Sequence, residues 1–543
     1  MKRVVLRIGC GAVCAALALT LGCGCALLPP ATGVPGAASS AVSVPTDDNG
    51  KPLYDPAVLN DGRLRALYCY GRSGSSTTIL CGSTPLHQAA RSENVSLVED
   101  SATGIADYWL RSWSDPTGRG GRRTALYDKT GTEVMSFEGE QNATLQNGLL
   151  VLQESRLIDG GYVPESGCGS CQVIDLATGA ALPVPEGAYS CIVSGDKLVF
   201  NCYARPAELA EDDWDTDSSL HSWVVAQEKD GTPISRFETT SAYRFLYESE
   251  AINDWVDLHI RTAADADSTQ VLYNPTTGEQ LANFLCTYDG GLASFSTSDG
   301  RYELRDMTVE DHGLIATFED MPTQYFPGYV VAWHEGEAPG SILYDLETGE
   351  KTQLYQTDAS DCTISLYAMD GTLRIYDRST GRLLTDTTVE PLADQQRVWM
   401  EDCCNGYVLL RMFSGSSYDP AAIRLYGPTG LVSDLTALQE KYSYINHLTM
   451  DPAGRPMFYG SRAAAGSAYG NVCDVLDADG KVVLQGLASC TGYYSNSLNA
   501  LPDHVFAAQR GFYTGWMDTS GNWLYCQSIF SSATADDEPS YGY

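Results

Sequence analysis

A short phrase recurs along the chain and restricts what it can fold into. An apolar stretch ends in Tyr or Asp, a few polar residues follow, and a Gly precedes a second stretch. Clear copies occupy 126–131, 173–179, 272–278, 343–349 and 375–381, and looser copies have their turn glycine at Gly231, Gly430, Gly480 and Gly521. Aliphatic and aromatic residues suit a pleated strand, Asp, Asn and Thr form local hydrogen bonds at a bend, and Gly accepts a positive φ. Each copy therefore predicts a strand, a tight turn and a second strand.

The spacing of the copies indicates how the hairpins assemble. Successive turn glycines lie 48, 52, 47, 71, 32, 49, 50 and 41 residues apart. Four-stranded blades of repeat proteins run to roughly 40–50 residues, and other strand pairs fill several periods, for example around Gly148 and Gly406. The spacings of 71 and 32 together approach two periods, with 293–297 as a candidate extra strand. We expect an all-β fold, a single β-propeller of four-stranded antiparallel blades, with eight blades or, as the alternative, seven.

The turn sequence resembles known repeats. Tyr-Asp-x-x-Thr-Gly, as in 376–381, resembles the repeat of quinoprotein-like β-propellers, and 515–523 is similar to a WG repeat. The resemblance covers 95–530 and implies a propeller of such blades. The Trp that usually follows the turn Gly in quinoprotein blades is absent from most copies. We therefore expect no cofactor.

The N-terminus is typical of an exported protein. A basic start precedes an apolar run over 13–21, and Cys23 follows the small residue Gly22. This resembles a bacterial lipoprotein cleavage site, which predicts a signal peptide over 1–22 and a lipid on Cys23. Cys25 is the runner-up for lipidation, and an ordinary secretory signal with incidental cysteines is the alternative.

The remaining chain divides by composition. Residues 23–44 are rich in Pro, Ala, Gly and Ser, which predicts a flexible linker behind the lipid anchor. Residues 45–94 are a candidate for closing the ring, in which a strand from 60–90, such as 64–69, pairs near 522–528. Residues 95–530 are the predicted propeller, and 531–543 are a polar tail. No further stretch approaches the roughly 20 apolar residues of a membrane-spanning helix. We expect an extracytoplasmic protein whose N-terminal lipid holds it to the membrane.

The charge of the chain limits its partners. The formal net charge is −35, from 69 acidic and 34 basic residues. A nucleic-acid backbone and an anionic surface would both be repelled. We therefore expect no nucleic-acid partner, and solubility at an exposed surface accounts for the acidity.

Signatures of catalysis and of metal binding are missing from the sequence. It contains no H-E-x-x-H, no P-loop and no G-x-S-x-G elbow. The acidic run 211–217 lacks the Gly and Glu positions of a calcium loop. Cys168 and Cys171 form a C-x-x-C pair, but no second pair completes a zinc site, which favours a structural disulfide or free thiols. We expect no catalytic residue and no metal. Because distant blades can still assemble a site, an enzyme is disfavoured rather than excluded.

The long segments between strands indicate a binding face. If the Gly turns join the third and fourth strands of each blade, the segments before the third strand emerge on the opposite face. These segments are 114–122, 158–170, 205–221, 321–340, 414–421 and 463–470. Loops on a rigid scaffold often carry binding contacts, and exposed aromatic side chains anchor ligands. The candidate ligand-binding residues are Trp214, Tyr325, Phe326, Tyr329 and Trp333.

These observations predict a membrane-anchored propeller that binds a glycan or protein partner through its long-loop face. If the candidate aromatic side chains fold back onto the blades instead, they will be buried. One alternative is a carbohydrate-active hydrolase or lyase, which needs two carboxylates roughly 5–10 Å apart in the central channel. Another is a scaffold of an envelope assembly, which needs a large exposed apolar patch.

Overall fold

The chain is almost entirely β-structure in the part that the structure describes. The computed structural model describes residues 59, 61–71, 74–90, 92–101, 103–114, 122–154, 157–158, 161–162, 171–204, 221–239, 251–252, 254–260, 269–335, 340–392, 395–415, 418–463, 471–491, 501–511 and 513–528. Within these ranges there is no α-helix, and η2 (Thr436–Glu440) is a short 3₁₀ segment. The predicted all-β class is confirmed.

Most strands belong to four-stranded antiparallel sheets, of which the described residues form eight. The sheets that precede residue 320 are β4 (Asn94–Glu99), β5 (Ala106–Ser114), β6 (Arg122–Asp128) and β7 (Glu133–Glu138); β8 (Gln141–Gln146), β9 (Leu149–Glu154), β12 (Cys171–Asp175) and β13 (Ala180–Ala181); β14 (Ala188–Ser194), β15 (Lys197–Ala204), β16 (His221–Glu228) and β17 (Pro233–Thr239); β18 (Ala251–Ile252), β19 (Trp255–Ile260), β20 (Thr269–Tyr273) and β21 (Gln280–Ala282); and β22 (Phe284–Tyr288), β23 (Leu292–Ser296), β24 (Tyr302–Asp306) and β25 (Leu314–Phe318). The later ones are β33 (Gln395–Asp402), β34 (Val408–Ser414), β35 (Ala422–Gly427) and β36 (Gly430–Asp434); β37 (Tyr444–Met450), β38 (Pro456–Ala463), β39 (Asn471–Leu476) and β40 (Val482–Leu487); and β41 (Ser489–Thr491), β42 (Val505–Arg510), β43 (Tyr513–Asp518) and β44 (Trp523–Ser528).

A seven-stranded sheet contains two further four-stranded units. Its strands are β26 (Met321–Phe326), β27 (Tyr329–His334), β28 (Gly340–Asp345), β29 (Lys351–Ala359), β30 (Thr363–Ala368), β31 (Thr372–Asp377) and β32 (Leu383–Thr388). The first three residues of β29, 351–353, pair with β28, and the rest of the strand pairs with β30. The strand β29 is therefore the fourth strand of one unit and the first strand of the next.

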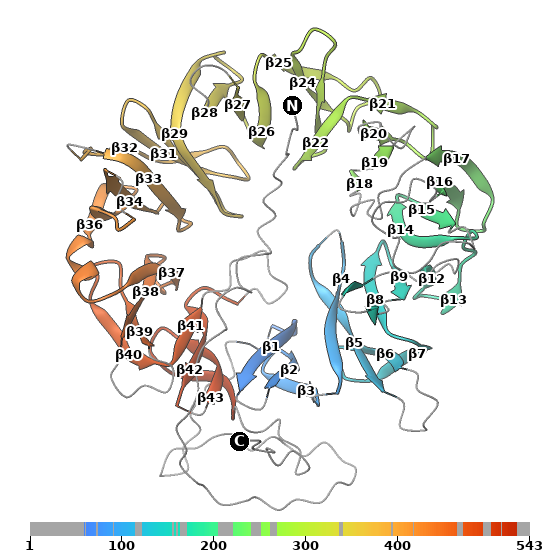
Figure 1. Cartoon of the computed structure of the whole chain (residues 1–543), viewed down its shortest axis with the longest axis horizontal. Coiled ribbons are helices and arrows are strands. Elements are labelled where there is room, and N and C mark those ends of the chain that lie inside the picture. Colours follow the sequence, from blue (N-terminus) through green and yellow to red (C-terminus); the bar gives the residue numbers. More distant parts are fainter. Residues whose placement is uncertain are drawn as a thin grey trace, which may run out of the picture.

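The sheets follow one another around a ring (Figure 1). In each sheet the first strand lies toward the centre and the last strand lies on the outside. Two smaller sheets complete the described strands: the hairpin β10 (Leu157–Ile158) and β11 (Gly161–Tyr162), and a three-stranded sheet of β1 (Leu64–Gly71), β2 (Gly74–Cys81) and β3 (Thr84–Gln88). This is a β-propeller type of arrangement.

The repeated phrase forms the turn between the third and fourth strands, as the sequence predicts. In the copy that ends at Gly381, Oδ1 of Asp377 accepts hydrogen bonds from the backbone N–H groups of Ser379 and Thr380, at 3.1 and 2.9 Å. Gly381 has φ +68°, and a Cβ added there would lie 2.0 Å from the carbonyl oxygen of Pro327 in the preceding unit. A larger residue would therefore strain the backbone and clash with the neighbouring unit.

The predicted counts of eight or seven blades are not confirmed. Where the spacing of 71 residues between Gly278 and Gly349 suggests a shifted blade, the structure has the complete sheet β22–β25. The predicted extra strand at 293–297 is confirmed as β23, but the last turn of the sheet, 307–313, lacks the repeated phrase, so the sequence does not show a complete sheet here. The following spacing of 32 is short because β29 serves two units. Together with the eight separate sheets, the described strands make ten four-stranded units.

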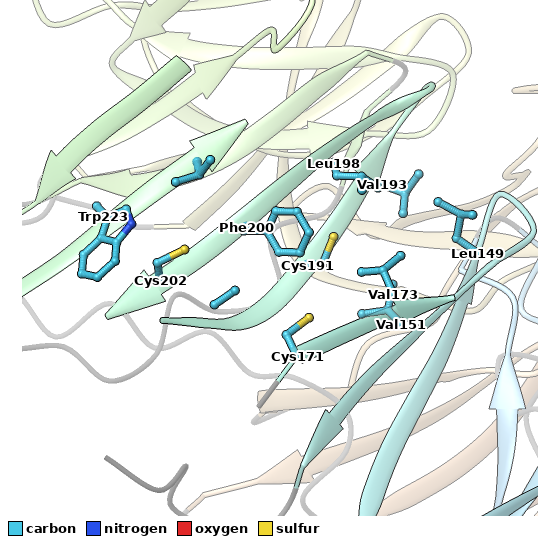
Figure 2. Packing of buried hydrophobic residues seen from close by; sticks show 12 residues of the cluster. Leu149, Val151, Cys171, Val173, Cys191, Val193, Leu198, Phe200, Cys202 and Trp223 are labelled. Atoms are coloured by element: carbon cyan, nitrogen blue, oxygen red, sulfur yellow. The ribbon is translucent and has the colours of Figure 1, made fainter. Parts of the chain in front are cut away.

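Apolar side chains pack between neighbouring sheets rather than within one sheet. Figure 2 shows one such cluster, between the sheet that contains β9 and β12 and the sheet β14–β17. Its labelled residues are Leu149, Val151, Cys171, Val173, Cys191, Val193, Leu198, Phe200, Cys202 and Trp223. Because a fully buried aliphatic or aromatic side chain contributes about 1.5–3 kcal/mol, each sheet depends on its neighbours for stability.

The three-stranded sheet β1–β3 packs between the last and the first four-stranded sheets. On one side Leu67 and Leu80 belong to a buried cluster with Trp516, and Thr78 Oγ1 donates a buried hydrogen bond of 2.8 Å to Gln527 Oε1. On the other side the buried residues are Leu64, Ala66, Ile79, Val95, Ala106 and Trp109. The expected pairing with 522–528 is wrong, because β1 pairs with β2 and β44 pairs with β43. Contact at this junction is made by side chains.

Candidate functional site

The aromatic residues that the sequence analysis selects lie on strands rather than on a long loop. Tyr325 and Phe326 belong to β26, and Tyr329 and Trp333 belong to β27, its antiparallel partner. The expectation of a loop over 321–340 is therefore wrong for 321–334. Trp214 lies outside the described residues, as do the predicted lipid carrier Cys23 and its runner-up Cys25.

Two of these aromatic residues, Phe326 and Tyr329, meet in the core between units. Phe326 is buried and stacks on Tyr329 with ring centroids 5.0 Å apart, and both rings contact Tyr376 of β31. Tyr325 is half-buried nearby, whereas Trp333 lies at the other end of β27 and is 40% exposed. The structure therefore does not bring the candidates together, and ligand binding by them stays a prediction.

A pocket that the sequence analysis did not identify lies between the inner strands of two neighbouring units. It has a volume of about 390 Å³. Its lining residues are Tyr355 and Gln356 of β29, Arg397, Val398 and Trp399 of β33, Phe413 of β34, and Tyr418, which follows β34. We call this the aromatic pocket.

The aromatic pocket presents large rings to solvent. Trp399 is 64% exposed and Tyr418 is 90% exposed. The guanidinium of Arg397 lies 4.8 Å from the ring centre of Phe413 and 5.8 Å from that of Tyr418. Cations over aromatic faces at such distances are attracted by about 0.5–1 kcal/mol at exposed sites. The stacked cation helps to hold these rings in place before any ligand arrives.

The alternation of β33 explains how Trp399 reaches the surface. Successive side chains of a strand point to opposite faces, and Val398 and Met400 are buried while Arg397 and Trp399 are exposed. The sequence does not show which of these residues points outward, because Val398, Trp399 and Met400 are three apolar residues in a row. It also does not show which strand lies beside Trp399.

The aromatic pocket lies on the long-loop face. Gln395 near the start of β33 pairs with Ser414 at the end of β34, and β34 is followed by the predicted loop 414–421 that contains Tyr418. Gln356 of β29 pairs with Tyr367 near the end of β30. It therefore lies close to the turn between β30 and β31, which are the second and third strands of that unit. The pocket therefore uses the face on which the sequence analysis expects binding, but with other residues.

A polar cluster occupies the opposite end of the same two inner strands. The carboxylate of Asp402 is buried and accepts hydrogen bonds from the hydroxyls of Ser360, Thr363 and Ser365, at 2.9, 2.5 and 2.6 Å, and from the backbone N–H of Cys404 at 2.9 Å. Because both of its oxygens are occupied by protein donors, Asp402 is suited to join the two units rather than to act on a substrate.

Asp358 lies beside this cluster and is unusual among the acids of the chain. Its Oδ2 accepts the backbone N–H of Asp402 at 2.8 Å. Burial and, to a smaller extent, the negative charge of Asp402 raise the pKa of Asp358 to about 6. The two residues are joined by this hydrogen bond, and both oxygens of Asp402 already accept hydrogen bonds from the protein. This geometry does not favour the hydrolase alternative.

A second ionisable group lies on the long-loop face. His334 at the end of β27 is partly exposed, and its Nδ1 lies 2.7 Å from Oδ1 of the buried Asp320. The Tyr344 hydroxyl donates to the other carboxylate oxygen. These two hydrogen bonds outweigh burial and lower the pKa of Asp320. The arrangement orients one face of the imidazole outward, with no nucleophilic side chain bonded to it in the described structure.

The described residues contain neither a metal-binding cluster nor a membrane-spanning helix. No group of three or more His, Cys, Asp or Glu side chains suited to a metal occurs among the described residues. In the same part of the chain, no helix has the length and apolar character needed to cross a membrane. Of the C-x-x-C pair, Cys171 is a buried free thiol on β12, and Cys168 lies outside the described residues.

The chain is a propeller-type all-β protein, and comparisons with known proteins add little to that. Residues 272–537 match a family model described as a domain of unknown function (DUF5046). No curated protein sequence matches the chain. We draw no functional conclusion from the structural similarities, because their TM-scores are low.

Several solved structures resemble part of the chain. BamB from Moraxella catarrhalis is 13% identical, covers 60% of this chain and 96% of its own, and has a TM-score of 0.28. The β-propeller domain of the Trilobed protease from Pyrococcus furiosus is 12% identical, with coverages of 62% and 93% and a TM-score of 0.26. A eukaryotic initiation factor is 12% identical, with coverages of 67% and 94% and a TM-score of 0.33.

Proposed function

We propose that this protein is a glycan-binding propeller whose binding site is the aromatic pocket. The observation that carries the proposal is the exposure of Trp399 and Tyr418 around a pocket of about 390 Å³. Large aromatic side chains cost free energy when they face water and no partner. A ligand with an apolar face would bury them.

The chemistry of the pocket favours a sugar over a purely apolar ligand. The C–H face of a sugar ring can stack on Trp399, while its hydroxyls can bond to the amide of Gln356 and to the guanidinium of Arg397. Pockets that bind small ligands combine apolar walls with a few polar groups in this way. The net charge of −35 disfavours polyanionic ligands, so a neutral glycan is the better match.

A binding assay with matched variants tests this function. The protein lacking residues 1–44 is applied to glycan and peptide arrays, and a hit is titrated by calorimetry. Trp399→Ala should weaken glycan binding about tenfold or more, because loss of a stacked anchor costs about 1–2 kcal/mol. Trp333→Ala is the control, since Trp333 is also exposed but lies outside the pocket. It should bind like the wild type.

The other possible outcomes of this binding assay each contradict part of the proposal. Unchanged glycan binding by Trp399→Ala places the site elsewhere, and a loss in Trp333→Ala alone restores the site expected from the sequence. Peptide binding that needs Trp399 keeps the pocket and changes the ligand class. Binding to neither array removes the glycan-receptor function and favours the scaffold alternative.

We also propose that the sheets close into one ring of eleven blades, ten of four strands and one of three. The packing of β1–β3 against both the last and the first four-stranded sheets supports this closure. A closed ring would hold the inner strands β29 and β33 at a fixed separation. The aromatic pocket depends on that separation.

We also propose that the protein is exported and held to the membrane by an N-terminal lipid. The N-terminal sequence supports export and lipidation at Cys23, with 23–44 as the tether between membrane and ring. The test is metabolic labelling of the full chain with a clickable fatty acid. Cys23→Ser should abolish the label and Cys25→Ser should retain it. The reverse pattern moves the lipid to Cys25, and label-free wild-type protein in the medium indicates an ordinary secretory signal.

A further inference from the structure

Two cysteines from different units meet at the end of the inner strands opposite the aromatic pocket. Cys362 is in the turn between β29 and β30, and Cys404 is in the turn between β33 and β34. The Cys404 backbone has φ +63°, a left-handed conformation that is uncommon for residues other than Gly. Such conformations persist where the surrounding structure holds them. Here the N–H of Cys404 is held by the buried carboxylate of Asp402 at 2.9 Å.

The two thiols are in hydrogen-bonding contact with one another. Both residues also contact one hydroxyl, because Ser360 Oγ lies 3.4 Å from the Sγ of Cys404 and 3.3 Å from the backbone nitrogen of Cys362. Ser360 itself donates to Asp402. The same polar cluster that joins the two units therefore positions both cysteines.

The thiols differ in access and acidity. Cys362 is exposed, whereas Cys404 is half-buried. The hydrogen bond from Cys404 lowers the pKa of Cys362 to about 7, against burial and against the negative charges of Asp361, Asp402 and Asp503, which raise it. The same hydrogen bond and burial raise the pKa of Cys404. Cys362 is therefore the more reactive nucleophile at neutral pH.

We propose that Cys362 and Cys404 form a redox-active dithiol that closes into a disulfide between neighbouring units by exchange with a low-molecular-weight disulfide. The Cys362 thiolate attacks one sulfur of the small disulfide, which forms a mixed disulfide and releases one thiolate. Cys404 then loses its proton and attacks the Cys362 sulfur, and the second small thiol leaves. Two protein thiols are oxidised, and one small disulfide is reduced to two thiols.

The chain contains a second pair that serves as an internal control. Cys473 of β39 and Cys490 of β41 also share a hydrogen bond between neighbouring sheets, but they are 7% and 3% exposed. A small disulfide cannot reach them without local opening. The pair Cys362–Cys404 should therefore react first, although the two thiols are in contact in both pairs.

The experiment is timed oxidation of the full chain, reduced beforehand, with oxidised glutathione. Aliquots are quenched, alkylated under denaturing conditions and mapped by mass spectrometry. The linked peptide of Cys362 and Cys404 should form at least tenfold faster than that of Cys473 and Cys490. Its rate should rise with pH to a plateau above about 7, and be about tenfold below the plateau at pH 6, because only the thiolate reacts.

Variants identify the order of the steps. Cys404→Ser should stop at a glutathione adduct on Cys362, and Cys362→Ser should leave Cys404 reduced. Cys473→Ser is the matched control, and the Cys362–Cys404 linkage should form in it at the wild-type rate. The proposal is overturned if wild-type protein accumulates the adduct on Cys362 without the linkage. Equal oxidation rates of the two pairs, or a rate that rises only near the ordinary thiol pKa of about 8.5, would also overturn it.

Discussion

Replacing Asp402 by Ala should destabilise the junction between the units β29–β32 and β33–β36. The carboxylate accepts four hydrogen bonds, three from hydroxyls and one from the Cys404 backbone N–H. Of the hydroxyl donors, Thr363 and Ser365 are almost completely buried. The half-buried Ser360 can turn toward Thr363, whose Oγ1 is 3.2 Å away. Mainly Ser365 and the Cys404 N–H are then left without an acceptor.

The expected cost follows from these unsatisfied donors. A buried donor without an acceptor costs about 1–3 kcal/mol, so Asp402→Ala, which leaves two such donors, should lose about 2–6 kcal/mol. Asp402→Asn keeps one acceptor oxygen and should lose about 1 kcal/mol, and Ser365→Ala, which removes a donor, should lose a similar amount. Urea unfolding followed by tryptophan fluorescence measures these differences. Asp386→Ala is the control: Asp386 is half-exposed on the surface of β32 and should lose less than about 0.5 kcal/mol.

A loss below about 1 kcal/mol for Asp402→Ala would refute the reasoning. It would mean that water reaches the donors, and that Asp402 is not the buried link between the two units. An equal loss for Asp402→Asn and Asp402→Ala would instead attribute the effect to the charge rather than to the hydrogen bonds.

The remaining predictions concern the same junction and the seam of the ring. Asp358 has its pKa raised to about 6 from 3.8, so its contribution to stability is complete below pH 3.8 and is lost as the pH rises through about 6. Between pH 3.8 and about 6, the free energy of unfolding of the wild type, measured by urea titration, should therefore fall by about 2–3 kcal/mol relative to that of Asp358→Asn. If the two proteins show the same dependence of unfolding free energy on pH, the prediction is wrong. Leu80→Ala should cost about 2–5 kcal/mol, because Leu80 is fully buried against Trp516. Hydrogen exchange should then accelerate in β42–β44, and unchanged exchange there would show that the seam is not closed by this contact.

The hairpins were predictable because their causes are local. The Asp377 side chain bonds to the backbone two and three residues ahead, and Gly381 takes the positive φ that ends the turn. Every group in that turn is within a few residues of the others. The sequence therefore shows the strands, the turns between the third and fourth strands, and the all-β class.

The number of sheets was not predictable from the repeats. The sheet β22–β25 ends in a turn without the repeated phrase, and β29 pairs on its two halves with different strands. Neither feature changes the local pattern that marks a strand. Both alter the spacing of the glycines, and spacing alone cannot separate a long blade from two short ones.

The residues of the candidate site were likewise only partly predictable from the sequence. Aromatic content drew attention to Phe326 and Tyr329, but these rings lie in the core beside Tyr376 of another unit. Trp399 stands between Val398 and Met400 in the sequence, and this apolar run does not show that its side chain points outward. What it adjoins depends on β29 and on the loop after β34.

Residue types and their order specify each hairpin of this protein, because strand preference, turn hydrogen bonds and glycine φ act over a few residues. The aromatic pocket and the pair Cys362–Cys404 come from the packing of separate units against one another. Contacts between β29 and β33 join residues about forty positions apart. No local rule carries that information, since the distance between two units is set by how their buried side chains interlock.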